Sequence, residues 1–208
     1  MRALAFLFLL GLVPSPAAAD WPWPYPNSTL PSQVRLVTWN GAAPDAALGQ
    51  FTVIIRDLAN NPVPGSTVSV DFTSVPEVRI AADQMDPEAL TICGEHRVRK
   101  LTGADGSATF TIMGSVSSAP ARLGEFRVPI LADGMLLGTP MLAVFDLDGA
   151  GGIGANDMSV WLEDFSEGLY RGRGDYDGDQ NLGANDLSVL LSAQGAGGSS
   201  VGISTYCP

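Results

Sequence analysis

The segment STVSVDFTS, residues 66–74, alternates between apolar and polar side chains with a period of two. Val68, Val70 and Phe72 fall on one side of the segment, and the polar residues between them fall on the other. Successive side chains of a β-strand point to opposite faces of a sheet. This period therefore predicts a strand with one buried face and one solvated face.

Two further segments, SATFTIMG and EFRVPI, repeat this period. Their apolar positions are Ala108, Phe110 and Ile112 in the first and Phe126, Val128 and Ile130 in the second. Turn signals separate the strands, at Asn60-Asn61-Pro62, Pro64-Gly65, Asp105-Gly106 and Asp133-Gly134. No long segment with a helical period precedes residue 145. The pattern predicts a mainly β fold, with a β-sandwich over residues 33–144.

A family resemblance supports this prediction. FTVIIRDLANNPVPGSTVSVDFTS followed by LTGADGSATFTIMG resembles bacterial immunoglobulin-like domains of the invasin and intimin type. In those domains a strand, a D-x-x-x-N-P-V-P-G turn and a second strand precede a T-x-x-x-G-x-A-x-F strand. The resemblance covers roughly residues 33–145 and implies an immunoglobulin-like β-sandwich. Such domains mostly serve as spacers or adhesion modules, and the fold alone does not fix a function.

Residues 1–19 have the form of a secretory signal peptide. Arg2 precedes the apolar run of residues 3–13, and small residues in an A-x-A pattern follow at residues 17–19. The run is shorter than the roughly 18 apolar residues that a membrane anchor needs. We therefore expect a secreted protein, extracellular or associated with a cell surface, whose mature chain begins at Asp20.

Residues 20–32 begin the mature chain with alternating aromatic residues and prolines, which predict an extended arm. Trp21, Trp23 and Tyr25 are costly to expose, so the arm either docks onto a partner or lies on its own domain. Asn27 begins an Asn-Ser-Thr sequence, the acceptor pattern for N-glycosylation.

A second kind of segment occurs twice near the C-terminus. DYDGDQNLGAND, residues 175–186, follows a related copy, DLDGAGGIGAND, residues 146–157, at a spacing of 29 residues. From residue 145 onward there are ten Asp and Glu against two Arg, in a chain of formal net charge −11. Such a tail would repel phosphates, which disfavours nucleic acid, and suits either a solvated acidic tail or a cation site.

The spacing of the carboxylates matches an EF-hand-type calcium loop, in which positions 1, 3, 5, 7 and 12 supply oxygen ligands. The predicted ligands are Asp175, Asp177, Asp179, Asn181 and Asp186 in the second loop, and Asp146, Asp148, Gly152 and Asp157 in the first. Position 5 of the first loop is Ala150, so water would replace one ligand there at lower affinity. Position 6, usually glycine, is Gln180 in the second loop. The pattern predicts one or two Ca²⁺ ions.

Each loop precedes an apolar pattern with helical spacing, which predicts two helices with buried stripes. The stripes consist of Met158, Trp161, Leu162 and Phe165, and of Leu187, Leu190 and Leu191. A duplicated loop and helix with Asp at position 12 resembles dockerin domains over residues 145–195. The resemblance implies that these aspartates bind calcium and that the module plugs into a cohesin-like protein. It also implies that the recognition positions are Ala155, Asn156, Ala184 and Asn185.

Residues 196–208 form a C-terminal tail that ends near Cys207, one of two cysteines in the chain. In an oxidising compartment, Cys207 and Cys93 could pair and clip the tail back onto the first domain. The alternative is two unpaired thiols, because the sequence does not show whether their Cα atoms come close enough.

No motif indicates an enzyme. Cys93 and His96 form one C-x-x-H pair, but no second pair completes a zinc site, and His96 is expected on the surface of a strand. Nucleophile-elbow, P-loop and Rossmann motifs are absent from the sequence. We therefore expect a non-catalytic interaction protein that docks to an extracellular partner. The alternatives are a self-associating subunit of an extracellular fibre and an adhesin that binds glycans.

Overall fold

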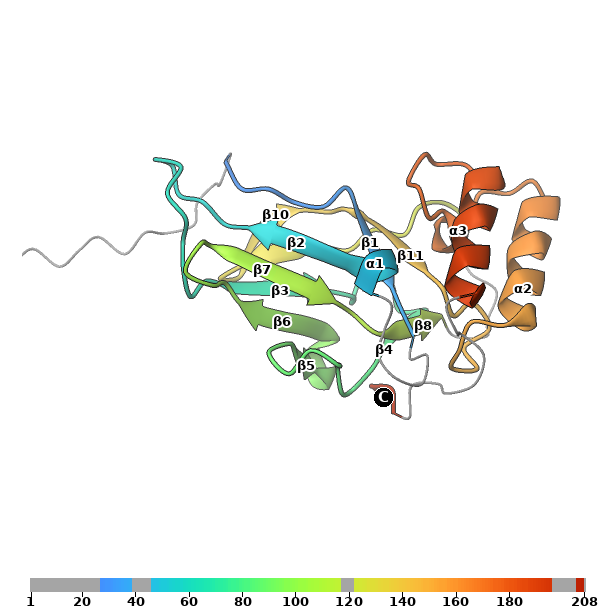
Figure 1. The fold of residues 1–208 in the computed structure, drawn as a ribbon, viewed down its shortest axis with the longest axis horizontal. Coiled ribbons are helices and arrows are strands. Elements are labelled where there is room, and N and C mark those ends of the chain that lie inside the picture. The colour runs from blue at the N-terminus through green and yellow to red at the C-terminus, as the bar shows by residue number, and fades with distance from the viewer. Residues whose placement is uncertain (1–26, 39–45, 117–121, 196–204, 208) are drawn as a thin grey trace, which may run out of the picture.

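The fold is described by a computed structural model, which covers residues 27–38, 46–116, 122–195 and 205–207 (Figure 1). The predicted signal peptide and the side chains of Trp21, Trp23 and Tyr25 lie outside the described residues. The described chain is mainly β structure, with two longer helices at its C-terminal end (Figure 1).

The strands form one larger sheet and three pairs. In chain order they are β1 (Gln33–Leu36), β2 (Gln50–Ile54), β3 (Thr67–Asp71), β4 (Val78–Ile80), β5 (Leu90–Ile92), β6 (Arg97–Leu101), β7 (Ser107–Thr111), β8 (Gly114–Val116), β9 (Ile130–Ala132), β10 (Met135–Gly138) and β11 (Met141–Val144). The five-stranded antiparallel sheet has the order β10-β9-β3-β6-β5. The pairs β2-β7 and β4-β8 are antiparallel, whereas β1 and β11 run parallel.

The helical segments are short before residue 145. They are α1 (Ala46–Gly49) and the 3₁₀ turn η1 (Cys93–Glu95), followed by α2 (Ala155–Ser166), the 3₁₀ turn η2 (Gly172–Gly174) and α3 (Ala184–Gly195). We refer to residues 145–195 as the helical module. Within the described residues, none of these helices has the length and apolarity needed to cross a membrane.

The period-two pattern predicts β3 and β7 correctly. The buried side chains are Val68, Val70 and Phe72 near β3, and Ala108, Phe110 and Ile112 near β7. All belong to one continuous apolar cluster with the inner side chains of the other strands. Mainly β structure is therefore confirmed, with alternate side chains forming the core.

The prediction was only partly right for EFRVPI. Phe126, Val128 and Ile130 are buried as expected. However, β9 begins only at Ile130, after Pro129, whose nitrogen has no hydrogen to donate to a ladder. Before it, Arg127 forms a single isolated bridge with Met141.

The turn signals lie where the chain reverses. Asp133 and Gly134 have φ of 48° and 83° and join β9 to β10, as the type I′ hairpin requires. Asp105-Gly106 instead links β6 to β7, which lie in different sheets. A Cβ at Gly106 would lie 2.5 Å from the carbonyl oxygen of Ile55, so this turn needs glycine.

Both ends of the described chain are held against the β structure. Thr29, in the predicted arm, bridges Ile54, and the exposed Asn27 donates to the carbonyl of Asp57 at 3.4 Å. At the other end, Tyr206 bridges Ala81. The part of the arm from Asn27 on therefore lies on its own domain.

Cys93 and Cys207 form a disulfide across a sequence separation of 114 residues. His96, close to this disulfide, is not a strand residue as expected. It ends η1 in the left-handed conformation at φ 51°, and its half-buried ring has its pKa lowered by burial. The strand β6 begins only with the next residue, because the left-handed backbone at His96 interrupts the extended chain.

The helical module packs directly on the β1-β11 pair. The fully buried Tyr176 stacks on Phe145 with ring centroids 4.7 Å apart, and its hydroxyl donates to the carbonyl of Val144 at 3.0 Å. The side-chain amide of Gln33 in β1 donates to the carbonyl of Asp175. The strand pair therefore positions the start of both acidic loops, since β11 leads directly into the first.

The two predicted helices form, but their buried stripes are narrower than expected. Trp161 and Leu190 are each 1% exposed. Leu162, Phe165 and Leu191 are about half exposed, at 47%, 51% and 50%. The polar side chain of Asp164 occupies the buried face of α2 instead, where it pairs with the chain segment that precedes the second loop.

Candidate metal centre

Two groups of carboxylates gather where loops meet the N-terminal ends of α2 and α3. One contains Asp146, Asp148 and Asp157, and the other contains Asp175, Asp177, Asp179 and Asp186. In each group, one oxygen from every carboxylate lies within 4.8 Å of the others. The structure thus brings together all seven predicted aspartates, in clusters that could hold a metal ion.

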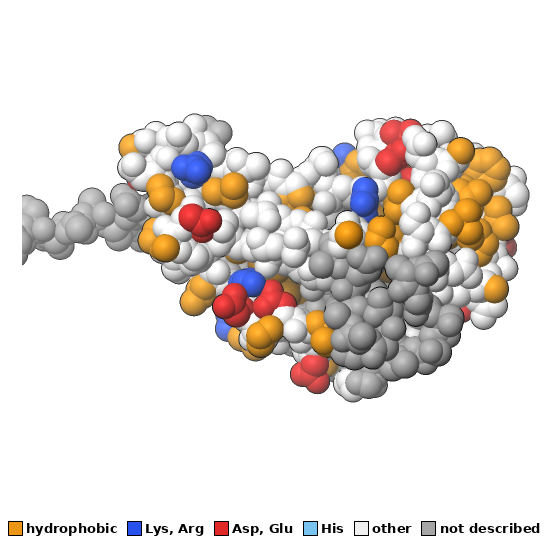
Figure 2. Space-filling model, in the orientation of Figure 1, with side chains coloured by type: hydrophobic (Ala, Val, Ile, Leu, Met, Phe, Trp, Pro, Cys, Tyr) orange, Lys and Arg blue, Asp and Glu red, His pale blue; other side chains and the backbone are white. Residues whose placement is uncertain are grey.

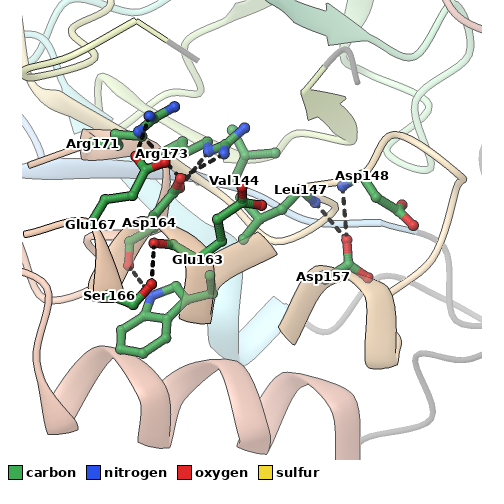
Figure 3. Close-up of polar contacts among 12 residues, drawn as sticks. Val144, Leu147, Asp148, Asp157, Glu163, Asp164, Ser166, Glu167, Arg171 and Arg173 are labelled. Atoms are coloured by element: carbon green, nitrogen blue, oxygen red, sulfur yellow. Dashed lines mark hydrogen bonds and ion pairs between the residues drawn. The ribbon is translucent and has the colours of Figure 1, made fainter. Parts of the chain in front are cut away.

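The aspartate at position 12 closes the first loop with three hydrogen bonds. Asp157 Oδ1 accepts the backbone N–H groups of Leu147 at 2.6 Å and Asp148 at 3.1 Å (Figure 3). Its Oδ2 accepts the N–H of Gly154 at 2.6 Å, at the start of α2. The carboxylate therefore ties the beginning of the loop to the beginning of the helix.

Asp186 closes the second loop in the same way. Its Oδ1 accepts the N–H groups of Tyr176 at 2.6 Å and Asp177 at 3.1 Å, and its Oδ2 accepts that of Gly183 at 2.9 Å. A carboxylate oxygen has two lone-pair sites, so one hydrogen bond leaves capacity for a cation. The two copies thus share a backbone scaffold as well as a sequence pattern.

Position 6 of each loop has a left-handed backbone. Its φ is 89° at Gly151 in the first loop and 67° at Gln180 in the second. In both loops this residue donates its N–H to the position-1 carboxylate, Asp146 at 2.9 Å and Asp175 at 3.0 Å. The turn therefore forms with glutamine, although a side chain in this conformation costs roughly 1–2 kcal/mol.

The remaining predicted ligands are those at positions 5 and 7, where the two loops have different residues. Ala150 is exposed at position 5 of the first loop and supplies no side-chain oxygen. Asp179, its counterpart, accepts the N–H of Asn181 at 2.8 Å. The ligand roles of Gly152 and Asn181 stay predictions, since neither belongs to the carboxylate groups.

Asp146 is the most perturbed carboxyl of the two groups. It is completely buried, and its Oδ1 has no hydrogen-bond partner among the described residues. Burial, together with the nearby Asp157 and Asp148, raises the pKa of Asp146 to about 7. Burial likewise raises the pKa of Asp157 and of Asp186. A buried, unpaired carboxylate oxygen is costly, and a bound cation would compensate it.

The donor set fits a hard cation. Every side chain in the two groups offers carboxylate oxygen, and neither group contains His or Cys. Hard cations such as Ca²⁺ prefer such ligands, whereas Zn²⁺ favours nitrogen and sulfur. The orphaned oxygen of Asp146 is an independent sign that the first loop is shaped for a ligand.

A tyrosine hydroxyl contacts the first carboxylate of each loop. Tyr170 donates to Asp175 Oδ2 at 2.6 Å, and Tyr206 donates to Asp146 Oδ2 at 3.2 Å. Burial raises the pKa of Tyr206 to about 12, and burial and the Asp175 hydrogen bond raise that of Tyr170. Both phenols therefore keep their protons and donate. The sequence pattern gives no sign of either contact.

A buried ion pair holds the chain just before the second loop. Arg173 contacts Asp164 through its Nε at 2.7 Å and its Nη2 at 2.9 Å (Figure 3). The indole of Trp161 donates to the carbonyl of Gly174 at 3.0 Å. These contacts fix η2 against α2 and set the starting point of Asp175. Sequence reasoning missed the pair because it treated α2 as a purely apolar stripe.

The four predicted recognition residues, Ala155, Asn156, Ala184 and Asn185, are exposed in the first turns of α2 and α3. No protein-family model matches this chain, and no curated protein sequence is significantly similar to it. Its function is therefore inferred from the geometry of the loops and their surroundings.

Proposed function

We propose that the two acidic loops bind Ca²⁺ and that the chain is a secreted, non-catalytic interaction protein that docks to an extracellular partner. The observation that carries this proposal is the convergence of seven carboxylates in two loops whose position-12 aspartates accept matching hydrogen bonds. Four carboxylates in one loop and three in the other would repel one another without a cation.

Calcium suits these loops better than the other common divalent cations. Ca²⁺ accepts six to eight oxygen ligands in flexible geometry, whereas Mg²⁺ demands near-ideal octahedral geometry and retains its waters. The exposed side chains of Asp177 and Asp179 leave room for water to complete the coordination. In the first loop, water would take the place that Ala150 leaves.

The helical module offers a surface for a protein partner. Figure 2 shows hydrophobic side chains gathered at the end of the molecule that α2 and α3 form. Leu162, Phe165 and Leu169 are each about half exposed. Phe165 and Leu169 line a hollow of about 200 Å³ with Leu182, which lies in the second loop between Asp179 and Asp186. Exposed apolar side chains that gather in this way are typical of interaction sites. The dockerin resemblance favours a cohesin-like partner.

The calcium proposal is tested by isothermal titration of Ca²⁺ into the mature chain, residues 20–208. We expect two bound ions in the unaltered chain and one in Asp175→Asn. Asp83→Asn, which removes an exposed carboxylate outside both loops, should leave two. Equilibrium dialysis that retains no calcium at millimolar concentration would contradict the proposal.

The docking proposal is tested separately, with the mature chain immobilised and a panel of purified cohesin domains in solution. Binding should require calcium, disappear with a chelator, and weaken at least tenfold in Phe165→Ser. Leu58→Ser, which removes an exposed leucine remote in sequence from the helical module, is the matched control. Binding that ignores both calcium and Phe165, or no binding to any domain of the panel, would count against docking through this surface.

A further inference from the structure

The residues 205–207, here called the C-terminal clip, are fixed to the β structure on both sides of Tyr206. Ala82 donates its N–H to the carbonyl of Thr205 at 3.0 Å, and Cys207 donates its own to the carbonyl of Ile80 at 2.9 Å. The Cys207 side chain is bonded to Cys93. The clip therefore has a defined position although it follows the helical module in the chain.

From this position the clip touches the first acidic loop in two ways. The hydroxyl of Tyr206 donates to Asp146 Oδ2 at 3.2 Å. The guanidinium of Arg79 lies over the Tyr206 ring, 4.5 Å from its centroid, and donates to the carbonyl of Gly149 at 3.0 Å. Positions 1 and 4 of the loop are thus linked to the same aromatic ring.

These contacts determine which oxygen of Asp146 is left for a ligand. Oδ2 accepts from both Tyr206 and the N–H of Gly151, whereas Oδ1 has no hydrogen-bond partner among the described residues. The two donors hold the carboxylate by one oxygen and leave the other unengaged. Because Asp146 is completely buried, water cannot readily substitute for them.

In the second loop, the corresponding hydrogen bond comes from a residue that is close in the sequence. Tyr170, five residues before Asp175, donates to its Oδ2. The tyrosine of the first loop lies 60 residues away in the sequence, beside the disulfide-bonded Cys207. The first loop also lacks the carboxylate at position 5 and so has fewer ligands to fix the ion.

We propose that Tyr206, held by the Cys93–Cys207 disulfide, positions Asp146 as the first calcium ligand of the first loop. The calcium affinity of this loop then depends on the C-terminal clip, and that of the second loop does not. This inference rests on the proposed calcium binding.

The test uses the mature chain with Asp175→Asn, so that only the first loop binds. In this background Tyr206→Phe removes one hydroxyl and should weaken calcium binding about tenfold, the scale of other supporting contacts to metal ligands. Thr205→Ala changes an exposed side chain of the same clip and should have no effect. Calcium dissociation constants come from isothermal titration.

A second set of variants tests the role of the disulfide and the independence of the second loop. Cys93→Ser with Cys207→Ser should weaken the first loop at least as much as Tyr206→Phe, with circular dichroism showing that the fold is retained. In an Asp146→Asn background, where only the second loop binds, neither change should alter the dissociation constant. Tyr170→Phe should weaken the second loop alone.

The inference is overturned if Tyr206→Phe keeps the affinity of the first loop within twofold, or weakens both loops equally. If the serine variants do not fold, Tyr206→Phe, which retains the disulfide, still decides the outcome. Failure of the unaltered chain to bind any calcium would overturn both the inference and the proposed function. Normal binding by the unaltered chain with no effect of Tyr206 would overturn the inference alone.

Discussion

The two acidic loops hold their position-12 aspartates identically and their position-1 aspartates differently. Asp157 and Asp186 each accept three backbone N–H groups from matching positions. Asp175 accepts N–H groups from Gly178 and Gln180 and a hydroxyl from the neighbouring Tyr170. In Asp146, Oδ2 accepts the N–H of Gly151 and the hydroxyl of the remote Tyr206, and Oδ1 has no hydrogen-bond partner among the described residues.

This difference separates what a repeated sequence determines from what its surroundings determine. The shared G-A-N-D sequence places the last carboxylate of each loop on a helix N-terminus, where the backbone and the helix dipole favour it. The first carboxylate meets different surroundings in each copy, with Tyr206 of the C-terminal clip at Asp146 and Tyr170 of the helical module at Asp175. The loops therefore have one scaffold and two environments.

Removing calcium from both loops should have the largest effect. A ligand at about 100 times its dissociation constant stabilises a fold by roughly 2.7 kcal/mol per site, so two loops contribute about 5 kcal/mol. At roughly 2–4 °C per kcal/mol, chelation should lower the melting temperature by about 10–20 °C. Calorimetry with 1 mM calcium or excess chelator measures the shift, and magnesium serves as the control. An unchanged melting temperature would mean that neither loop depends on a cation.

Disabling one loop at a time should give about half of that effect. Asp175→Asn and Asp146→Asn should each remove one ion and, in calcium, roughly 2.7 kcal/mol of stability. Without calcium the outcomes should differ, because Asp146→Asn removes a buried, partly unpaired carboxylate and should stabilise the chelated chain. Denaturant melts with and without chelator measure both. Equal stability of the two variants in chelator would show that the different surroundings of Asp146 and Asp175 do not affect the calcium-free chain.

The sequence alone was enough to identify the acidic loops and their helices. Ligand spacing and helix period are local properties, and both were repeated, which made the pattern distinct. The same holds for Val68 and Phe110, whose burial follows from the period of two. The sequence also marks Gln180 as the unusual residue of its loop, and Gln180 has the left-handed backbone that glycine normally adopts.

The contacts that distinguish the loops could not be predicted, because they join residues that no local pattern connects. Tyr206 and Asp146 are 60 residues apart, and the sequence does not show whether Cys93 and Cys207 come close enough to pair. The burial of Asp164 could not be predicted either, since the partner that makes it favourable, Arg173, lies on a turn without helical period. The half exposure of Phe165 could not be predicted either. The face of α2 that packs is narrower than the apolar stripe in its sequence.

Restoring a position-5 ligand to the first loop should have an intermediate effect. Ala150 is exposed, so Ala150→Asp introduces a carboxylate without displacing packed atoms. We expect calcium to bind the first loop about tenfold more tightly, which corresponds to about 1.4 kcal/mol. Ala150→Asn offers a neutral oxygen and should give a smaller gain. Titration in the Asp175→Asn background measures both, and an unchanged affinity would show that the missing carboxylate is not what separates the loops.

Exchanging the position-6 residues should have the smallest effect on stability, with opposite signs in the two loops. Gln180→Gly removes a side chain from a left-handed backbone, which favours the folded loop by roughly 1–2 kcal/mol, whereas the extra freedom of glycine in the unfolded chain offsets roughly 0.5–1 kcal/mol. The net gain should be about 0.5–1 kcal/mol. Gly151→Gln should destabilise the chain by a similar amount, because it imposes the same conformation on glutamine in the first loop. Denaturant melts in calcium measure both. If both variants lose stability, the exposed Gln180 side chain contributes to its loop beyond its backbone, and the loops differ at position 6 as well as at positions 1 and 5.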